Sequence, residues 1–487
     1  MNPSTAILVA LVLPLLGALL ISLTGSRPNL RESVTLATGG ILFLVVASIL
    51  PSVLDGGRPE VEVLEVMPGL ALAFKVEPLG MLFSLVASGL WIVTSLYAIG
   101  YMRGHHEKNQ TRFYVFFAVA ISAALGVAFA RNMFTLFIFY EMLTLSTYPL
   151  VTHHRSEDAK RSGRIYMGIL MSTSIGLLLL GMIWTWHLTG TLEFTPGGIL
   201  EGKASSTIIG VLLALYAFGT GKAALMPFHR WLPAAMVAPT PVSALLHAVA
   251  VVKAGVFTVM KVVVYLFGTD LLSSTGLSIW LMYVAGATIL IGSLVALTKD
   301  NLKARLAYST ISQLSYIVLG AALANNWGVI GGSMHIAMHA VGKITLFFCA
   351  GAIMVASHKT EISDMAGIGR TMPVTMVAFF IGAVSVIGLP PMGGSWSKWY
   401  LALGAADAHQ NILVAVLMIS SLLNIAYLMP IVARAFFIAP NEPPEHEGIH
   451  EAPVLCVVAL CLTAAGCVGL FFYAGDLYRL LMPIVQP

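Results

Sequence analysis

Long apolar runs recur from one end of the chain to the other, and short polar or charged stretches separate them. A run of roughly 20 apolar residues crosses the hydrocarbon core of a bilayer as one α-helix. Bounding the runs by charge or by Gly/Pro clusters gives about 14 candidate spans. The candidate spans are 4–24, 33–54, 77–101, 112–130, 132–152, 164–188, 206–225, 240–267, 274–297, 301–322, 327–356, 373–402, 411–437 and 452–474. The pattern therefore predicts an all-α, polytopic membrane protein.

Residues 55–76 differ from the rest of the chain. They read VEVLEV and LALAF around MPG, and this alternation of apolar and polar positions fits a short β-hairpin outside the membrane. An irregular loop is the plainer interpretation of the same residues.

The loops between the spans alternate in charge. One set contains Arg27, Arg31, RGHHEKNQTR, HHRSEDAKRSGR, KDNLKAR and SHKTEISDMAGIGR. The other set contains DGGRPEVEVLE, TGTLEFTPGG, GTDLLSST and AADAHQ. Because Lys and Arg concentrate in cytoplasmic loops, the first set is predicted to face the cytoplasm, with both termini outside. We expect a bacterial or archaeal cell (inner) membrane as the location.

Prolines interrupt two of the spans in a related way. The interruptions are LYAFGTGKAALMPFHRWLP, around Lys222 and Pro227, and VSVIGLPPMGGSWSKWYL, before Lys398. Broken helices persist where the chain lines a polar cavity, so both segments are predicted to be broken helices. Their positions as seventh and twelfth spans suggest two inverted five-helix repeats. The expected divisions are 1–110 (helices 1–3), 111–270 (first repeat, helices 4–8), 271–440 (second repeat, helices 9–13) and 441–487 (a cytoplasmic loop and helix 14).

Composition agrees with a membrane protein and narrows the candidate chemistry. Of the 487 residues, 58% are hydrophobic and 10% charged, whereas a soluble domain carries about a quarter charged residues. The net charge of +4 is spread over short loops, which gives no sign of a nucleic-acid partner. Four cysteines without a CxxC pair indicate neither a disulfide framework nor a zinc site.

Two short motifs are set aside. HEGIH, residues 446–450, matches a zinc-protease pattern, but it lies in a proline-rich loop and not on a helix. GTGK at Gly219 lacks the Ser or Thr of a phosphate-binding loop. We therefore expect no metal and no cofactor.

Six ionisable residues fall inside the predicted spans, which is the main functional signal. They are Glu141, Lys222, Lys253, Lys261, Lys343 and Lys398. A charged side chain near the bilayer centre costs on the order of 3 kcal/mol, so such residues usually face a protein interior or water and mark an ion path. A lysine is the expected partner of Glu141. Structural alternatives are bonding of Lys222 to loosened carbonyls, snorkelling or structural pairing of Lys261, and an interfacial position for Lys398.

The stretch MHIAMHAVGKITLFF places His335, His339 and Lys343 four residues apart. On a helix they form one polar stripe about 12 Å long. A histidine can both accept and donate a proton near neutral pH, so the stripe is a candidate proton wire. Two core histidines bonded to hydroxyls or water are the alternative, and a metal pair would need ligands that this helix lacks. His247, six residues before Lys253, is a candidate lateral relay.

These motifs together resemble the antiporter-like subunits shared by respiratory complex I and Mrp-type multisubunit cation/proton antiporters. The resemblance covers nearly the whole chain and is strongest over 131–400. It rests on YEMLTLSTYPLV, GKAALMPFHRWLPAAMVAPTPVSALLHAVAVVKAG, NLKARLAYSTISQLSYI, HIAMHAVGKITLFFCAG and GLPPMGGSWSKWYL. The chain stops soon after the fourteenth predicted span, which makes it most similar to D-type Mrp subunits, with complex I and hydrogenase-type relatives close behind.

The resemblance implies 14 helices, two inverted repeats and a place among other membrane subunits. It implies a Glu141–Lys222 pair and lateral passage of protons through Lys253, His335, His339 and Lys343 to Lys398. It also implies exchange against a monovalent cation such as Na⁺. Two other functions stay open from the sequence: the proton-pumping subunit of a redox-driven complex, and a secondary transporter for an organic solute.

Overall fold

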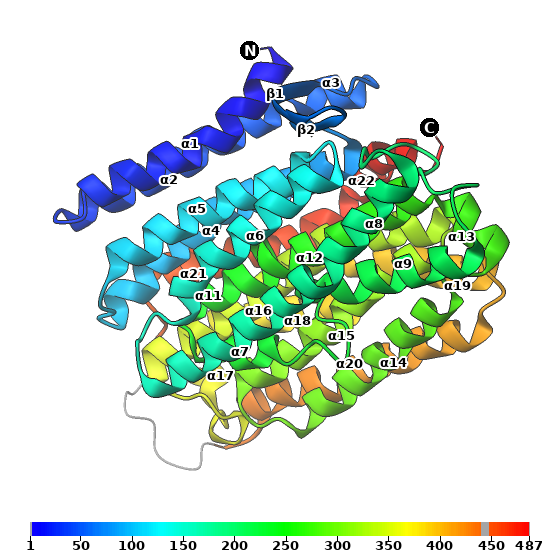
Figure 1. Cartoon of the computed structure of the whole chain (residues 1–487). Helices are drawn as coiled ribbons and strands as arrows, with labels where there is room; N and C mark the ends of the chain where they lie inside the picture. The colour runs from blue at the N-terminus through cyan, green and yellow to red at the C-terminus, as the bar shows by residue number, and fades with distance from the viewer. Residues whose placement is uncertain (1, 440–447, 487) are drawn as a thin grey trace.

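The computed structural model describes residues 2–439 and 448–486. Long helices run side by side through most of the molecule (Figure 1). Eleven helical segments of the described chain are long and apolar enough to cross a membrane. Two shorter apolar helices, α9 (Ser206–Gly219) and α18 (Pro373–Ile387), each precede a break. The all-α, polytopic membrane fold is therefore confirmed.

The first half of the chain supplies α-helices that are joined in places by π-helical turns. They are α1 (Pro3–Leu23), α2 (Pro28–Ala47), α3 (Leu50–Leu54), α4 (Pro78–Gly104), α5 (Gln110–Phe129), α6 (Met133–Val151), α7 (Glu157–Thr173), η1 (Ser174–Leu178), α8 (Leu179–Thr189), α9, α11 (Thr240–Ala244), η4 (Leu245–Val249), α12 (Val251–Val262) and η5 (Val263–Phe267). Short helical turns between α9 and α11 are η2 (Gly221–Ala223), α10 (Trp231–Ala234) and η3 (Ala235–Val237).

The second half continues with the following elements. They are α13 (Thr269–Thr275), α14 (Ile279–Thr298), α15 (Leu302–Ala322), α16 (Asn326–Ser357), η6 (Ile362–Asp364), α17 (Ile368–Thr371), α18, α19 (Gly394–Asp407), α20 (Asn411–Phe437), α21 (Val454–Phe472), α22 (Ala474–Leu481) and η7 (Met482–Ile484). Every predicted span overlaps one of these helices or broken helices. The number of spans, the inverted repeats and their boundaries stay predictions.

Helix caps explain where the predicted limits differ from the observed ones. α7 begins at Glu157, before the predicted start at 164, because the Ser156 side chain accepts a hydrogen bond from the Ala159 backbone N–H at 3.2 Å. Acidic residues in the first turn also favour a helix N-terminus. Charged residues extend this helix beyond its apolar stretch, so apolar length alone located its start too late.

Residues 60–75 form the hairpin and not the plainer loop. β1 (Glu60–Met67) pairs antiparallel with β2 (Leu70–Lys75), and Gly69 adopts a φ of 81° in the turn. β2 is largely buried, whereas β1 is largely exposed. The Asn132 side chain at the start of α6 donates to the Ala71 carbonyl at 2.8 Å, which fastens the hairpin to the helices.

The basic loops meet at the end of the helices opposite the hairpin and both termini (Figure 1). Arg31 donates to the Gln110 side chain at 2.8 Å, which joins the α1–α2 corner to the α4–α5 corner. Glu32 is buried there between Arg31, at 3.1 Å, and Arg103. The alternation of loop charge thus matches one face of the molecule, called the basic face below; its assignment to the cytoplasm stays a prediction.

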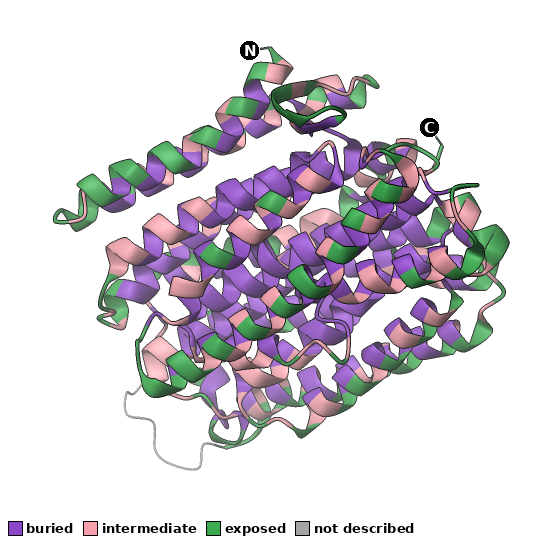
Figure 2. Cartoon of the chain, in the orientation of Figure 1, coloured by how far each residue is buried: buried purple, intermediate pink, exposed green. Residues whose placement is uncertain are grey.

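The most buried helices lie at the centre of the molecule (Figure 2). The most apolar window of the segment Thr240–Phe267, which contains α12, is 100% buried, compared with 33% for Pro28–Leu54. α16 packs against α15, α18, α19 and α21. The predicted central lysines and histidines therefore lie in protein and not in lipid.

Gly255 of α12 makes a close approach to the first broken segment. A Cβ at this position would overlap the peptide between Lys222 and Ala223 and lie 2.7 Å from the Lys222 carbonyl oxygen. We expect Gly255→Ala to cost about 1–3 kcal/mol, because the break would have to move. Thermal unfolding of the purified protein in detergent measures the effect.

Gly168 of α7 provides the matched control, because a Cβ there meets nothing within 4 Å. Gly168→Ala should keep or raise the unfolding temperature, since Ala favours helix by about 1 kcal/mol over Gly. Equal unfolding temperatures for the two variants would contradict the close packing.

Candidate functional site

Lys222 lies within the first helix break and not before it. α9 ends at Gly219, and Lys222 occupies the single 3-10 turn η2. Its ammonium donates to the Tyr140 carbonyl at 2.8 Å and to the Thr144 hydroxyl at 2.5 Å. The same nitrogen lies 3.2 Å from the centre of the Tyr140 ring. Neutral groups of α6 therefore surround a fully buried amine.

Glu141 follows Tyr140 on α6, but it does not contact Lys222 directly. Within the described residues, the two groups form no ion pair within 4.0 Å, and neither carboxyl oxygen has a hydrogen-bond partner. The neighbours one turn away, Ile138 and Leu145, are 39% and 56% exposed, so Glu141 lies at the edge of an outward face. A buried carboxyl without a partner is rare and calls for water, a proton or a covering chain.

Lys253 and His339 are in direct contact at the centre of the molecule. Lys253 extends from α12, and its Nζ lies 2.6 Å from His339 Nδ1 on α16. The His339 ring stacks with His335 one turn earlier, with ring centres 5.7 Å apart. Nε2 of His339 has no hydrogen-bond partner among the described residues. The side chains of Lys253 on α12 and of His339 and His335 on α16 thus lie in one row, although the two helices are about a fifth of the chain apart in sequence.

His335 continues this row toward the second helix break. Its Nδ1 lies 2.8 Å from the Ser397 hydroxyl, and its Nε2 lies 3.1 Å from the Gln313 side-chain oxygen. The ring also stacks on Tyr316, with centres 5.5 Å apart. The same ring contacts Lys398, whose Nζ is 4.8 Å from the ring centre.

Lys398 is held by the break itself. Its Nζ donates to the carbonyl of Ile387, the last residue of α18, at 2.9 Å. Ser421 of α20 lies 3.4 Å away from the same nitrogen. A helix end leaves carbonyls without intrahelical partners, and here one of them accepts a hydrogen bond from the half-buried Lys398. Contacts thus lead from Lys253 through His339 and His335 to the Tyr316 ring, which also contacts Lys398. We call Lys253, His339, His335 and Lys398 the central row.

Lys343 leaves the line of the two histidines, so the predicted stripe on α16 is divided. Its Nζ donates to the Ser309 hydroxyl at 2.6 Å and to the Leu306 carbonyl at 3.3 Å, both on α15. Ser309 in turn lies 2.8 Å from the Tyr427 hydroxyl, which bonds Asn424 on α20. Lys343 therefore starts a branch toward α20, whereas His335 and His339 belong to the central row.

One face of α15 supplies partners for three ionisable groups. Ser309 bonds Lys343, Gln313 bonds His335, and Tyr316 contacts both His335 and Lys398. Residues separated by three and four positions share a helix face, which explains why one helix serves all three groups. Sequence reasoning did not assign these residues a role, although the polar density of STISQLSY in an apolar span was a usable signal.

His247 and Lys261 are placed differently from the central row. Both ring nitrogens of His247 are buried without a hydrogen-bond partner in the described chain, and its ring stacks against Phe347 at 4.6 Å. Lys261 pairs with Glu77 at 3.3 Å and donates to the Ala130 carbonyl at 2.5 Å. This supports the structural pairing considered for Lys261, and it identifies Glu77 as a partner that the sequence did not reveal.

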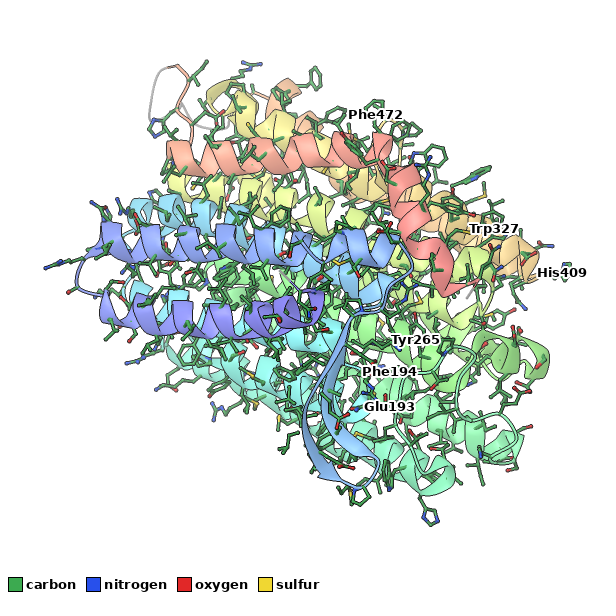
Figure 3. All side chains as sticks on the ribbon, turned by 90° about the horizontal axis from the view of Figure 1, so that it is seen from above. Glu193, Phe194, Tyr265, Trp327, His409 and Phe472 are labelled. Carbon is green, nitrogen blue, oxygen red and sulfur yellow. The ribbon has the colours of Figure 1, made fainter. Side chains whose placement is uncertain are left out.

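The Lys261 pair lies below the hairpin. Its Nζ is 4.5 Å from the centre of the Phe194 ring, and Phe194 and its neighbour Glu193 lie beside the hairpin when the molecule is seen from above (Figure 3). Glu193 is itself bonded by Arg131 at 2.9 Å. These contacts hold the connecting segments together at the end of the molecule opposite the basic face.

The motif HEGIH belongs partly to residues outside the described chain, since His446 and Glu447 are among 440–447. In the described part, no three His, Cys, Asp or Glu residues are arranged to hold a metal ion.

Comparison with known proteins identifies the family to which the chain belongs. Residues 130–424 match the family described as NADH:quinone oxidoreductase/Mrp antiporter, transmembrane. NADH-quinone oxidoreductase subunit N of Desulforudis audaxviator is 33% identical over 77% of this chain and 75% of that protein. A probable K⁺/H⁺ antiporter subunit of Rhizobium meliloti is 29% identical over 87% of this chain but only 43% of its own length. A chain of the Mrp complex from Dietzia sp. DQ12-45-1b superposes with a TM-score of 0.88, covering 100% of this chain and 97% of that one, at 23% identity. This last likeness shows the shared fold.

The Tyr316 ring contacts both His335 and Lys398. We expect Tyr316→Leu to destabilise the protein by about 1–2 kcal/mol beyond the loss of packing, because the half-buried Lys398 amine loses its cation–π contact. Tyr316→Phe keeps the ring and gives up a long hydrogen bond of 3.5 Å to the Leu417 carbonyl, so it should unfold near the unaltered temperature. Thermal unfolding of both variants tests this prediction. Equal decreases in unfolding temperature would contradict the role of the ring.

Proposed function

Because the chain belongs to the NADH:quinone oxidoreductase/Mrp antiporter transmembrane family, we propose that it is the proton-translocating subunit of a multisubunit monovalent cation (Na⁺)/proton antiporter. The observation that carries the proposal is the central row, in which four bases from α12, α16 and α19 are linked by side-chain contacts that include the Tyr316 ring. Such groups persist in a membrane interior where ions pass.

The chemistry of the row suits protons. A neutral imidazole accepts a proton on one nitrogen and releases one from the other, so His339 and His335 can relay a proton that Lys253 delivers. Ser397 and Gln313 orient the His335 ring through both nitrogens. Lys398, held by the freed Ile387 carbonyl, is the end of the relay. Lys343 and His247 border the row and complete the set of proton-transfer residues that we propose.

Glu141 and Lys222 form the proposed gate. Lys222 donates to the carbonyl of Tyr140, the residue that precedes Glu141. When Glu141 gains or loses a proton, the field at the neighbouring ammonium changes. In the proposed cycle this change releases the Lys222 ammonium from its two neutral acceptors and lets a proton move on toward Lys253. Each half of the chain then contributes one half-channel with a broken helix.

The proposed setting is a bacterial or archaeal inner membrane with both termini outside. Other membrane subunits of the antiporter are the proposed partners, and the outward edge at Glu141 is consistent with a covering chain. The relative from Rhizobium meliloti, which bears the name of a K⁺/H⁺ antiporter component, supports exchange against a monovalent cation.

A redox-driven complex is the second candidate. It is favoured by the relative named as subunit N of an NADH-quinone oxidoreductase, at 33% identity. Here the proton path would be the same, but electron transfer in partner chains would drive it. The subunits that purify with the native protein discriminate between the two, because flavin and iron–sulfur subunits belong to the redox complex and small membrane subunits alone belong to an antiporter.

Two substitutions test the gate without removing much volume. We expect Glu141→Gln and Lys222→Met each to lower Na⁺-driven proton movement by about 100-fold, because a proton-transfer group typically contributes that factor or more. Everted membrane vesicles that contain the complex, with a pH-sensitive dye, give the rate. Native gels show whether each variant still assembles.

Glu157 and Lys160 serve as matched controls, since they form an exposed pair on α7. Glu157→Gln and Lys160→Met should transport normally. Normal transport by an assembled Lys222→Met complex would refute the gate and, with it, the proposed proton path.

A further inference from the structure

A carboxylate on the basic face is enclosed by three histidines. The side chain of Glu107, in the loop after α4, is only 6% exposed. His105 Nδ1 lies 3.2 Å from one of its oxygens, and His153 Nε2 and His154 Nδ1 lie 3.8 Å and 3.7 Å from the other. The loops after α4 and after α6 meet in this cluster. Neither the central row nor the proposed gate uses any of these groups.

The cluster opens into a cavity. The cavity has a volume of about 200 Å³, and its walls include Glu107, His105, His154, Lys303 and Lys359. A water molecule in the liquid occupies about 30 Å³, so the cavity has room for several. His154 is exposed and marks the mouth, whereas the first turn of α15 forms the inner wall. The remaining walls come from the loop before α11 and from the end of α16.

α15 connects the cavity to the ionisable groups inside. Lys303 lies in its first turn and donates to the Ala238 carbonyl at 2.6 Å. One turn farther, the Leu306 carbonyl and the Ser309 hydroxyl accept hydrogen bonds from Lys343. Three residues along a helix correspond to a rise of about 4.5 Å. Along α15, a residue that lines the cavity thus lies one helical turn before the first residue that binds Lys343.

A purely structural cluster would not need these features. The buried His153 makes only a long contact with the carboxylate, since its Nε2 lies 3.8 Å from the oxygen, beyond hydrogen-bond distance. Its side chain is 1% exposed. A structural cluster would also need neither a water-sized cavity nor a second lysine on the inner wall.

We propose that this cavity is the port through which the interior exchanges protons with water on the basic face. Glu107 takes a proton from water, passes it through cavity water to the neutral amine of Lys303, and returns to the carboxylate. Lys303 then gives up one proton toward Lys343 and becomes neutral again, so charge and protons balance at each step. This inference rests on the proposed function, because it supplies the entry or exit of the same path.

The pH response of the port depends on the groups that face Glu107. These are His105, His153, His154, Lys303 and Lys359, while Arg112 and Arg155 act on His153. Burial lowers the pKa of His153 to about 4, and the charges of Arg112 and His154 act in the same direction. His153 is therefore neutral between pH 6 and 8, so it does not contribute a charge change in the range of the test.

Glu107→Gln tests the port in the assembled complex, reconstituted into liposomes. We expect Na⁺-driven proton movement to be slower by about tenfold or more at pH 8, because a positioned proton-transfer side chain typically contributes about 100-fold or more to the rate. Lowering the pH on the basic face should restore the rate, because direct protonation of Lys303 then replaces collection by Glu107. Lys303→Gln should be slow at every pH.

His106→Asn is the matched control, because His106 is exposed in the same loop with a φ of 52° that Asn tolerates. It should transport normally. A Glu107→Gln complex with the unaltered rate at pH 8, or one whose loss does not recover in acid, would overturn the port. If that variant does not assemble, a normal rate for Lys303→Gln would overturn it instead. Failure of the proposed function looks different, since Lys222→Met would then transport normally.

Discussion

The structure depends on one constraint: a polar group buried in a membrane interior must find its partner inside the protein. Each N–H of a buried ammonium that lacks an acceptor costs several kcal/mol. Lys222, Lys343 and Lys398 are satisfied by carbonyls and hydroxyls and not by carboxylates. Partners of this kind keep the lysines in place whether or not they carry a charge, because a lone pair on nitrogen can also accept from a hydroxyl. Groups that must alternate between two protonation states need this kind of surrounding.

The breaks in the helices follow from the same constraint, although each break meets it differently. Lys398 takes a carbonyl from the end of α18, which belongs to its own broken segment. Lys222 takes its carbonyl from Tyr140 on the neighbouring α6, and its backbone N–H donates to the Tyr140 hydroxyl at 3.1 Å. Gly255 has no Cβ, so α12 can pack directly against the backbone of Lys222 at the first break. The first break is therefore tied to the helix that carries Glu141, and a gate requires that kind of coupling.

The sequence predicts well what depends on local pattern. Apolar length located the helices, the alternation around MPG located the hairpin, and the cost of burying charge selected Lys222, Lys253 and Lys398. Residue spacing could not show that Lys343 turns toward Ser309, because the choice depends on where α15 lies. Nor could it show that Glu141 lacks a lysine in contact, since the Tyr140 carbonyl competes for the same ammonium. The cluster at Glu107 joins groups from loops far apart in the chain, and only the folded arrangement brings them together.

The absence of carboxylates beside the central row limits how many protons it can hold. Within residues 2–439 and 448–486, the side-chain partners of the row are hydroxyls, an amide and an aromatic ring. The rings of His335 and His339 have their centres 5.7 Å apart. Two positive charges at that distance repel by about 3 kcal/mol at an effective dielectric constant of 20. This repulsion corresponds to a factor of about 100 at equilibrium, so it disfavours the state in which both histidines carry a proton. In the proposed path, a proton that enters at Lys253 therefore meets this repulsion until the previous proton has left the two histidines toward Lys398.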